Sequence, residues 1–281
     1  MRFPTSWPES APRAGPAPLQ SPAMPAPPLT DKPSVVLDVL ERDRHVHPYG
    51  IYDVVNLWHR SRWWVRGHAV VGLITLPGSS EPVVYAVPAT ARTPTLDLLV
   101  DLIGELPPRL IIHGPDGVTD RLAQRYRTTW SAPHFKMHLA RPALVQAPDP
   151  DARVLGAADV PRLGRLFAAD PHPGTFFHDG LVASGHYVGI DDGRDVVAVC
   201  GVHLVDPRCG VAAIGNVTTH PAHRRRGLAR RAIAALCHRL LGEVDVIGLN
   251  VRRDNLAAQA LYASLGFVQA AEYEEAQLTE S

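Results

Sequence analysis

The spacing of apolar and polar positions changes along the chain, and these changes predict an α/β protein. From Val35 onward, short runs rich in β-forming residues predict strands at residues 63–66, 70–76, 83–87, 110–113 and 135–140. Helical spacing between them predicts helices at 96–106 and 118–126. A link punctuated by proline at 142–150 then separates this half of the chain from a second half.

The second half repeats the alternation of strands and helices. A short strand at 154–155 precedes a helix that Asp159 opens, and a further short helix is expected over 175–183. Strands are predicted at 186–190, 196–205, 211–219 and 245–251, helices at 228–241 and 255–265, and a terminal strand from Phe267. We therefore expect a mixed, mostly antiparallel sheet in an α/β (or α+β) fold, built from two similar halves.

Composition divides the chain into a tail and two domains. Residues 1–33 are rich in proline and poor in large apolar side chains, which predicts a disordered tail. The expected domains are an N-terminal α/β domain at 34–141 and a catalytic domain at 151–281. No apolar run is long enough to predict a transmembrane helix.

Charge and cysteine content exclude several classes of protein. The 28 Lys and Arg residues balance 28 Asp and Glu residues, which disfavours a general nucleic-acid-binding protein. Three cysteines without a C-x-x-C pair predict neither a disulfide framework nor a zinc site. We expect a soluble cytoplasmic protein that needs no metal and binds neither nucleic acid nor a membrane.

The segment richest in chemistry joins the strand at 211–219 to the helix at 228–241. Pro221 ends the strand, and a basic turn of Arg224, Arg225 and Arg226 leads through Gly227 into the helix. The first amides of a helix are free donors at the positive end of its dipole, and glycine allows a ligand to approach the backbone closely. These parts together predict a cradle for a pyrophosphate group.

Two motifs in this half resemble the GNAT N-acetyltransferase superfamily. Residues 224–229, Arg-Arg-Arg-Gly-Leu-Ala, are similar to its R/Q-x-x-G-x-G/A loop. Residues 255–267 match its second signature, N-x-x-A-x-x-L-Y-x-x-x-G-F. Residues 215–217 and 250–255 also resemble the glycine N-acyltransferase-like branch, and the N-terminal half is interpreted as a degenerate copy of the same fold.

The resemblance implies acetyl-CoA, or another acyl-CoA, held where the strands at 211–219 and 245–251 separate. It assigns the pyrophosphate to the turn at residues 224–229 (Arg224, Arg225, Arg226, Gly227, Leu228 and Ala229) and the pantetheine arm to Val217, Thr218 and Thr219. It also implies that Asn255 bonds the cofactor arm and that Tyr262 gives a proton to the departing thiolate.

The sequence does not identify the general base. The strand at 211–219 carries no carboxylate, so the candidates are His203, His220, His223 or a chain of waters, and His203 is preferred.

The expected function is acyl transfer from CoA to a primary amine by direct attack in a ternary complex. The acceptor is expected to be a small molecule or a peptide, and the protein is a candidate homodimer. The alternative is a non-catalytic acyl-CoA-binding sensor or interaction module of the same fold. The sequence identifies neither the acceptor nor the acyl chain length.

Overall fold

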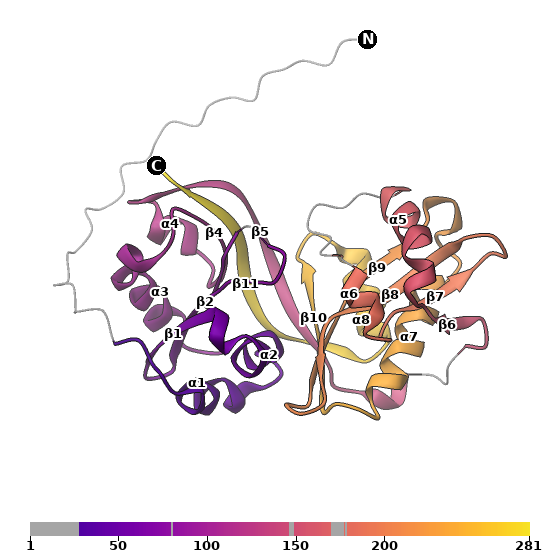
Figure 1. The fold of residues 1–281 in the computed structure, drawn as a ribbon, viewed down its shortest axis with the longest axis horizontal. Coiled ribbons are helices and arrows are strands. Elements are labelled where there is room, and N and C mark those ends of the chain that lie inside the picture. The colour runs from indigo at the N-terminus through magenta and orange to yellow at the C-terminus, as the bar shows by residue number, and fades with distance from the viewer. Residues whose placement is uncertain (1–27, 80, 146–148, 170–176, 178) are drawn as a thin grey trace, which may run out of the picture.

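The computed structural model describes residues 28–281 apart from residues 80, 146–148, 170–176 and 178 (Figure 1). The predicted tail therefore falls almost wholly outside the described residues, as does part of the helix expected at 175–183. The described α-helices are α1 (Pro33–Leu40), α2 (Pro48–Asn56), α3 (Arg92–Asp101), α4 (Val118–Leu122), α5 (Val160–Ala169), α6 (Asp179–Ala183), α7 (Leu228–Leu240) and α8 (Leu256–Ser264).

Eleven strands form one continuous sheet. They are β1 (Ser61–Arg66), β2 (Ala69–Ile74), β3 (Val83–Tyr85), β4 (Arg109–Gly114), β5 (Tyr126–Leu139), β6 (Ala152–Val154), β7 (Val188–Asp191), β8 (Val196–Asp206), β9 (Val211–Thr219), β10 (Val246–Arg252) and β11 (Phe267–Glu280). Their order is β1-β2-β3-β4-β11-β5-β10-β9-β8-β7-β6, and only the pairs β3–β4 and β9–β10 are parallel. The predicted mixed, mostly antiparallel sheet is confirmed.

The two halves of the chain have the same plan. The strands β1, β2, β3, β4 and β11 follow one another with the same directions as β7, β8, β9, β10 and β5. Helices occupy matching places along the chain: α3 precedes β4 as α7 precedes β10, and α4 precedes β5 as α8 precedes β11. The expected similarity of the halves is therefore visible in their topology.

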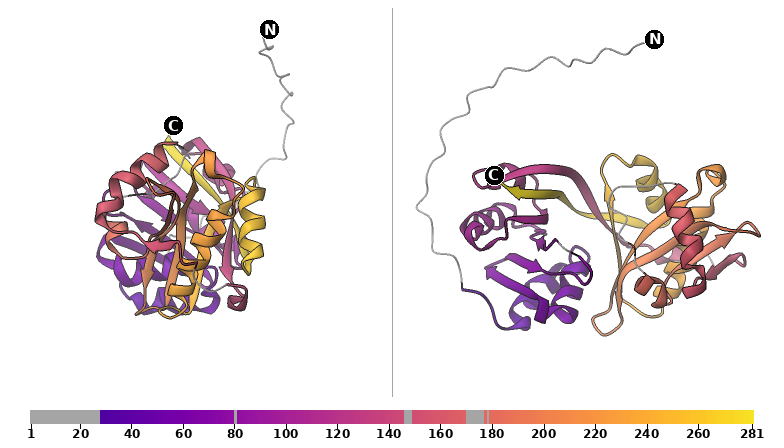
Figure 2. Two further views of the ribbon diagram at one scale, coloured as in Figure 1. Left: turned by 90° about the vertical axis from the view of Figure 1, so that its right-hand side faces the viewer. Right: turned by 45° about the horizontal axis from the view of Figure 1, so that its top comes forward.

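The halves exchange their last strands. The strand β5 belongs by sequence to the N-terminal half, yet it lies between β11 and β10, whereas β11 lies between β4 and β5. These two long strands run side by side from one half to the other (Figures 1 and 2). Met137 of β5 thus packs in the core of the C-terminal half, and Tyr273 and Leu278 of β11 pack in cores of the N-terminal half.

The structure corrects several predicted boundaries. The strand expected at 135–140 begins at Tyr126, and the helix expected to reach 126 ends at Leu122. Pairing with β11 extends along β5 as far as Tyr126, so tertiary pairing decides the conformation of this segment. The sequence analysis also missed α1 and α2, each of which begins with a proline in its first turn.

Candidate functional site

The parallel strands β9 and β10 separate partway along their length. They pair over only three residues of each, from Val211 opposite Val246 to Ala213 opposite Gly248. Beyond that point β10 continues its pairing with β5, and β9 continues with β8. Asn216 has a φ of 50° and lies at an irregularity in the β8–β9 register, which bends β9 away from its neighbour.

The N-terminal half shows no such gap at its own parallel pair. There β3 pairs with β4 up to Tyr85 opposite His113, and the amide of Ala86 still donates to the carbonyl of His113 at 2.8 Å. Among the described residues, the parallel strands therefore separate only in the C-terminal half.

The arginine turn presents unpaired backbone amides. The amides of residues 225–230 donate no hydrogen bond to other residues that the structure describes, whereas the amide of Arg231 bonds the carbonyl of Gly227. Arg225 and Gly227 both have positive φ, at 60° and 73°, which turns successive amides toward a common side. Arg224, Arg225, Arg226 and Gly227 are exposed, Ala229 is partly buried, and Leu228 anchors the helix in the core. This geometry suits a phosphate group.

A cavity of about 960 Å³ adjoins the separated strands. Of the residues predicted to hold the cofactor arm, Val217, Thr219 and Asn255 line it, and Ala229 lines it from the start of α7. The hydroxyl oxygen Oγ1 of Thr219 is buried with no hydrogen-bond partner among the described residues. Thr218 is buried and does not line the cavity, so its side chain takes no part in this surface.

Asn255 and Tyr262 lie two turns apart at the cavity wall. Asn255 caps α8, because its Oδ1 accepts from the amide of Ala258 at 3.1 Å. The Tyr262 ring packs edge-on against Phe267, with 5.8 Å between ring centroids, and the side chain is 7% exposed. Burial raises the pKa of Tyr262, so its phenol keeps the proton throughout the neutral and mildly alkaline range.

His203 on β8 lines the same cavity and is held from two sides. Its Nδ1 lies 3.0 Å from the Tyr49 hydroxyl, and its ring also hydrogen-bonds Asn216. The ring lies directly over Gly215, where a Cβ would come within 2.2 Å of Nε2. Burial lowers the pKa of His203, so the imidazole is neutral near pH 7.

The other two histidine candidates for the base lie elsewhere. His220 accepts from the amide of Ala222, and His223 lies 3.6 Å from a carboxylate oxygen of Asp192. Neither lines the cavity, so the structure brings only His203 together with Tyr262.

The N-terminal half supplies part of the cavity wall, and the sequence analysis predicted none of these residues as part of the site. These lining residues come from α2, β3, β4, β5 and β11: Tyr49, Tyr52, Asp53, Leu57, Val83, Tyr85, Ile111, His113, Trp130, His134 and Glu275. Their positions depend on the strand exchange and on packing of α2, so no local motif marks them. Pro48 followed by apolar Ile51 and Val54 was the available signal for α2.

Lys136 lies buried behind this wall in a cage of aromatic rings. Its Nζ lies 4.8 Å from the ring centre of Tyr49 and 4.9 Å from that of Tyr273, and it donates to Asn250 Oδ1 at 3.3 Å. Burial is the main cause that lowers the pKa of Lys136 to about 7. An amine with this pKa changes its charge near physiological pH.

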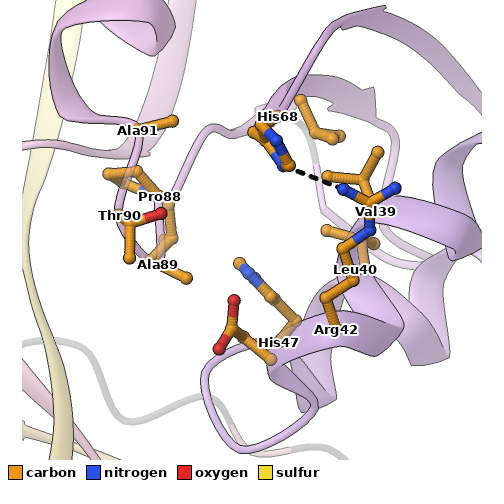
Figure 3. A pocket seen from close by; sticks show the side chains of 12 residues that line it. Val39, Leu40, Arg42, His47, His68, Pro88, Ala89, Thr90 and Ala91 are labelled. Carbon is orange, nitrogen blue, oxygen red and sulfur yellow. Dashed lines mark hydrogen bonds between the residues drawn. The ribbon is translucent and has the colours of Figure 1, made fainter.

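A second hollow, of about 30 Å³, lies in the N-terminal half beside His47 and Pro88 (Figure 3). Arg42 and His68 are hydrogen-bonded at its wall, and His47 bonds the Tyr85 hydroxyl at 2.7 Å. This space is large enough for water and too small for a metabolite.

The described residues hold neither a candidate metal site nor a candidate membrane-spanning helix. No cluster of three or more His, Cys, Asp or Glu side chains there is arranged to bind a metal ion. None of the helices in the described ranges combines the length and apolarity that crossing a bilayer requires.

Part of the chain is similar in sequence to known acetyltransferases. Residues 160–267 match the model of the acetyltransferase (GNAT) family. The N-alpha-acetyltransferase RimI of Mycobacterium tuberculosis is 33% identical over 120 residues, which cover 40% of this chain and 75% of that protein.

Solved structures extend the likeness to nearly the whole chain. A Drosophila protein with 16% identity superposes with a TM-score of 0.65 over 91% of this chain and 99% of its own. A GCN5-related N-acetyltransferase from Sphaerobacter thermophilus, also 16% identical, gives 0.54 over 88% of this chain and 90% of its own. These two show a shared fold. The sequence match to RimI, together with the family model, establishes that the chain belongs to the acetyltransferase (GNAT) family.

Proposed function

We propose that the protein transfers an acetyl group from acetyl-CoA to a primary amine. The observation that carries this proposal is the gap between β9 and β10 beside the unpaired amides of residues 225–230. The residues present fit the co-substrate: those amides and the side chains of Arg224, Arg225 and Arg226 would hold the pyrophosphate. Val217, the unpartnered Thr219 Oγ1 and Asn255 would bond the pantetheine arm, together with the backbone of Thr218.

The chemistry follows from the groups that meet in the cavity. The amine nitrogen forms a bond to the acetyl carbon, and the bond between that carbon and the CoA sulfur breaks. Tyr262 would protonate the departing thiolate, since its hydroxyl forms no hydrogen bond to a described residue and stays protonated at neutral pH. The reaction needs no covalent intermediate on the protein.

The proton released by the amine needs an acceptor. His203 is the proposed base, and its hydrogen bond to Tyr49 gives it a route to the substrate. The neutral imidazole would take the Tyr49 proton at Nδ1 as the Tyr49 oxygen takes one from the amine. The Asn216 side chain holds the ring in place for this transfer.

RimI is named for acetylation of α-amines, and this likeness makes an α-amine one candidate acceptor. The test is acetyl transfer to a panel of small amines and short peptides, read as a mass increase of the acceptor. Tyr262→Phe should lower kcat roughly 10²–10⁴-fold while the Kd for acetyl-CoA stays unchanged, because the ring remains and only the acid is lost.

The pyrophosphate cradle has its own test. Gly227→Glu places a carboxylate where the phosphate would lie, so the Kd for CoA should rise about 100-fold or more, equivalent to about 2.7 kcal/mol. Gly67→Glu is the matched control, because Gly67 also has positive φ and open space around it but lies in the turn between β1 and β2. Unaltered CoA binding by Gly227→Glu in a folded protein would exclude this cradle.

The same assays separate an enzyme from a sensor. Tight binding of acetyl-CoA without transfer to any acceptor in the panel, and with no effect of Tyr262→Phe, would favour a non-catalytic acyl-CoA-binding module.

A further inference from the structure

The end of the large cavity formed by the N-terminal half carries two carboxylates that the acetyl-transfer chemistry does not use. Asp53 comes from α2 and Glu275 from β11, and both line the cavity. Both act on the same neighbours: after burial, each contributes to the raised pKa of Tyr49, and each opposes the lowering of the pKa of Lys136 by burial.

Asp53 has no hydrogen-bond partner and no ion-pair partner for its carboxylate among the residues that the structure describes. It lies one helical turn after Tyr49, so both side chains project from the same face of α2 into the cavity. Burial raises the pKa of Asp53 to about 8 although the charge of Lys136 acts against this rise, so the side chain is mostly protonated near pH 7 when no ligand is bound.

Two histidines and a tyrosine lie close to the carboxyl group of Glu275. Its Oε2 lies 3.6 Å from His113 Nε2 and 3.8 Å from His134 Nε2, and it accepts from the Tyr273 hydroxyl at 3.4 Å. Burial lowers the pKa of His113 to about 3 and also lowers that of His134, so both rings are neutral near pH 7. These histidines therefore bring no positive charge to Glu275.

Arg252, the arginine of the cavity lining, already has an ion-pair partner. Arg252 donates to both carboxylate oxygens of Asp254, at 3.0 and 2.5 Å. Lys136 lies behind the wall among tyrosine rings and is not part of the lining. The described lining thus holds two acidic side chains without a free cation of its own, and a bound ligand cation would favour their ionised forms.

The remaining wall at this end is aromatic and aliphatic. Tyr49, Tyr52, Tyr85 and Trp130 line it, with Leu57 and Ile111 beside them. Aromatic faces attract cations as well as apolar groups, and apolar walls favour a ligand with little polar surface beyond its charge.

We propose that the acceptor is a small primary amine with an apolar or aromatic body, whose ammonium group is bound by Asp53 and Glu275. The N-terminal half would thus supply the acceptor subsite, while the C-terminal half binds acetyl-CoA. This proposal rests on the proposed function. It predicts that a free carboxylate next to the amine weakens binding, because it would meet Asp53 or Glu275.

The test is binding of three probes to the full chain saturated with CoA, by isothermal titration. The probes are 2-phenylethylamine, its neutral counterpart 2-phenylethanol, and L-phenylalanine, which adds a carboxylate. The amine should bind at least tenfold more tightly than the other two. In the variant Asp53→Asn/Glu275→Gln that advantage should disappear, and the Kd for CoA should stay unchanged.

Glu272→Gln is the matched control on the same strand, since Glu272 alternates to the opposite face of β11 and lies 3.5 Å from Arg253. It should bind the amine as the parent does. The proposal is overturned if the amine binds no better than the alcohol or L-phenylalanine. It is also overturned if the double variant keeps the parent's preference, or if a short peptide starting with alanine binds more tightly than the amine. Failure to bind CoA at all would instead refute the proposed function.

Discussion

At the scale of single residues, the site combines side chains that local sequence motifs predict with side chains that no local motif predicts. Four residues that line the cavity lie on strands or helices that local sequence motifs predict: Val217, Thr219, Asn255 and Tyr262. Tyr49, Asp53 and Glu275 reach it through contacts between residues more than 100 positions apart. The first kind could be predicted from spacing, and the second could not, because nothing nearby in the sequence encodes the contact.

Lys136 gives a residue-scale prediction about stability. Its pKa is about 7 in the folded protein against an ordinary value of 10.5. Between these values the unfolded chain holds a proton that the folded chain lacks, so this amine makes the free energy of unfolding rise with pH. The slope from one such group is at most about 1.4 kcal/mol per pH unit.

Replacing Lys136→Met should remove that rise. Relative to the parent, the free energy of unfolding of the variant should therefore fall by up to about 2 kcal/mol between pH 8 and 9.5, measured by urea denaturation. Asp53 has the opposite effect at lower pH. Its pKa is about 8 in the folded protein against an ordinary value of 3.8, so between these values the folded chain holds a proton that the unfolded chain lacks. This group therefore makes the free energy of unfolding fall as the pH rises through that range. The control is Lys32→Met, since Lys32 is exposed and is the only other lysine. Equal slopes for both variants would refute the prediction.

At the scale of elements, the pair β8–β9 makes room for the proposed base. A Cβ on Gly215 would lie 2.2 Å from His203 Nε2, so Gly215→Ala must displace the ring and break its bond to Tyr49. We expect the free energy of unfolding to fall by about 1–3 kcal/mol, with a large loss of kcat and an unchanged Kd for acetyl-CoA.

Gly189→Ala is the control for steric crowding within the sheet. Its Cβ would lie 2.8 Å from Leu155, within the same sheet but away from the cavity. The variant should lose stability and keep its kcat per folded molecule. A fully active Gly215→Ala protein would show that the position of His203 does not matter to the reaction.

The elements themselves were predictable to different degrees. The strand β9 begins and ends where the apolar pattern and Pro221 predict, because local pattern and tertiary pairing agree there. The helix α2 was missed because it is short and contains Gly50, which weakens helix propensity. That glycine is needed for packing, since a Cβ there would lie 2.9 Å from the Tyr85 ring.

At the scale of the whole molecule, the exchanged strands make each half depend on the other. Phe135, Met137 and Leu139 of β5 pack with the C-terminal half, while Tyr273, Ala276 and Leu278 of β11 pack with the N-terminal half. The sequence did not predict this exchange, because strand exchange changes which strands pair and leaves the pattern within each strand unaltered.

This dependence predicts that neither half folds alone. The fragment 149–281 would leave the edge of β10 unpaired and the apolar side chains of β11 uncovered, which favours aggregation. The fragment 28–145 would lack the strand between β4 and β5. Each should show little native circular dichroism, whereas the two produced together should assemble into one complex that binds CoA. A monomeric, cooperatively unfolding fragment 149–281 that binds CoA as the full chain does would contradict this, since the exchanged strands would then be dispensable for the site.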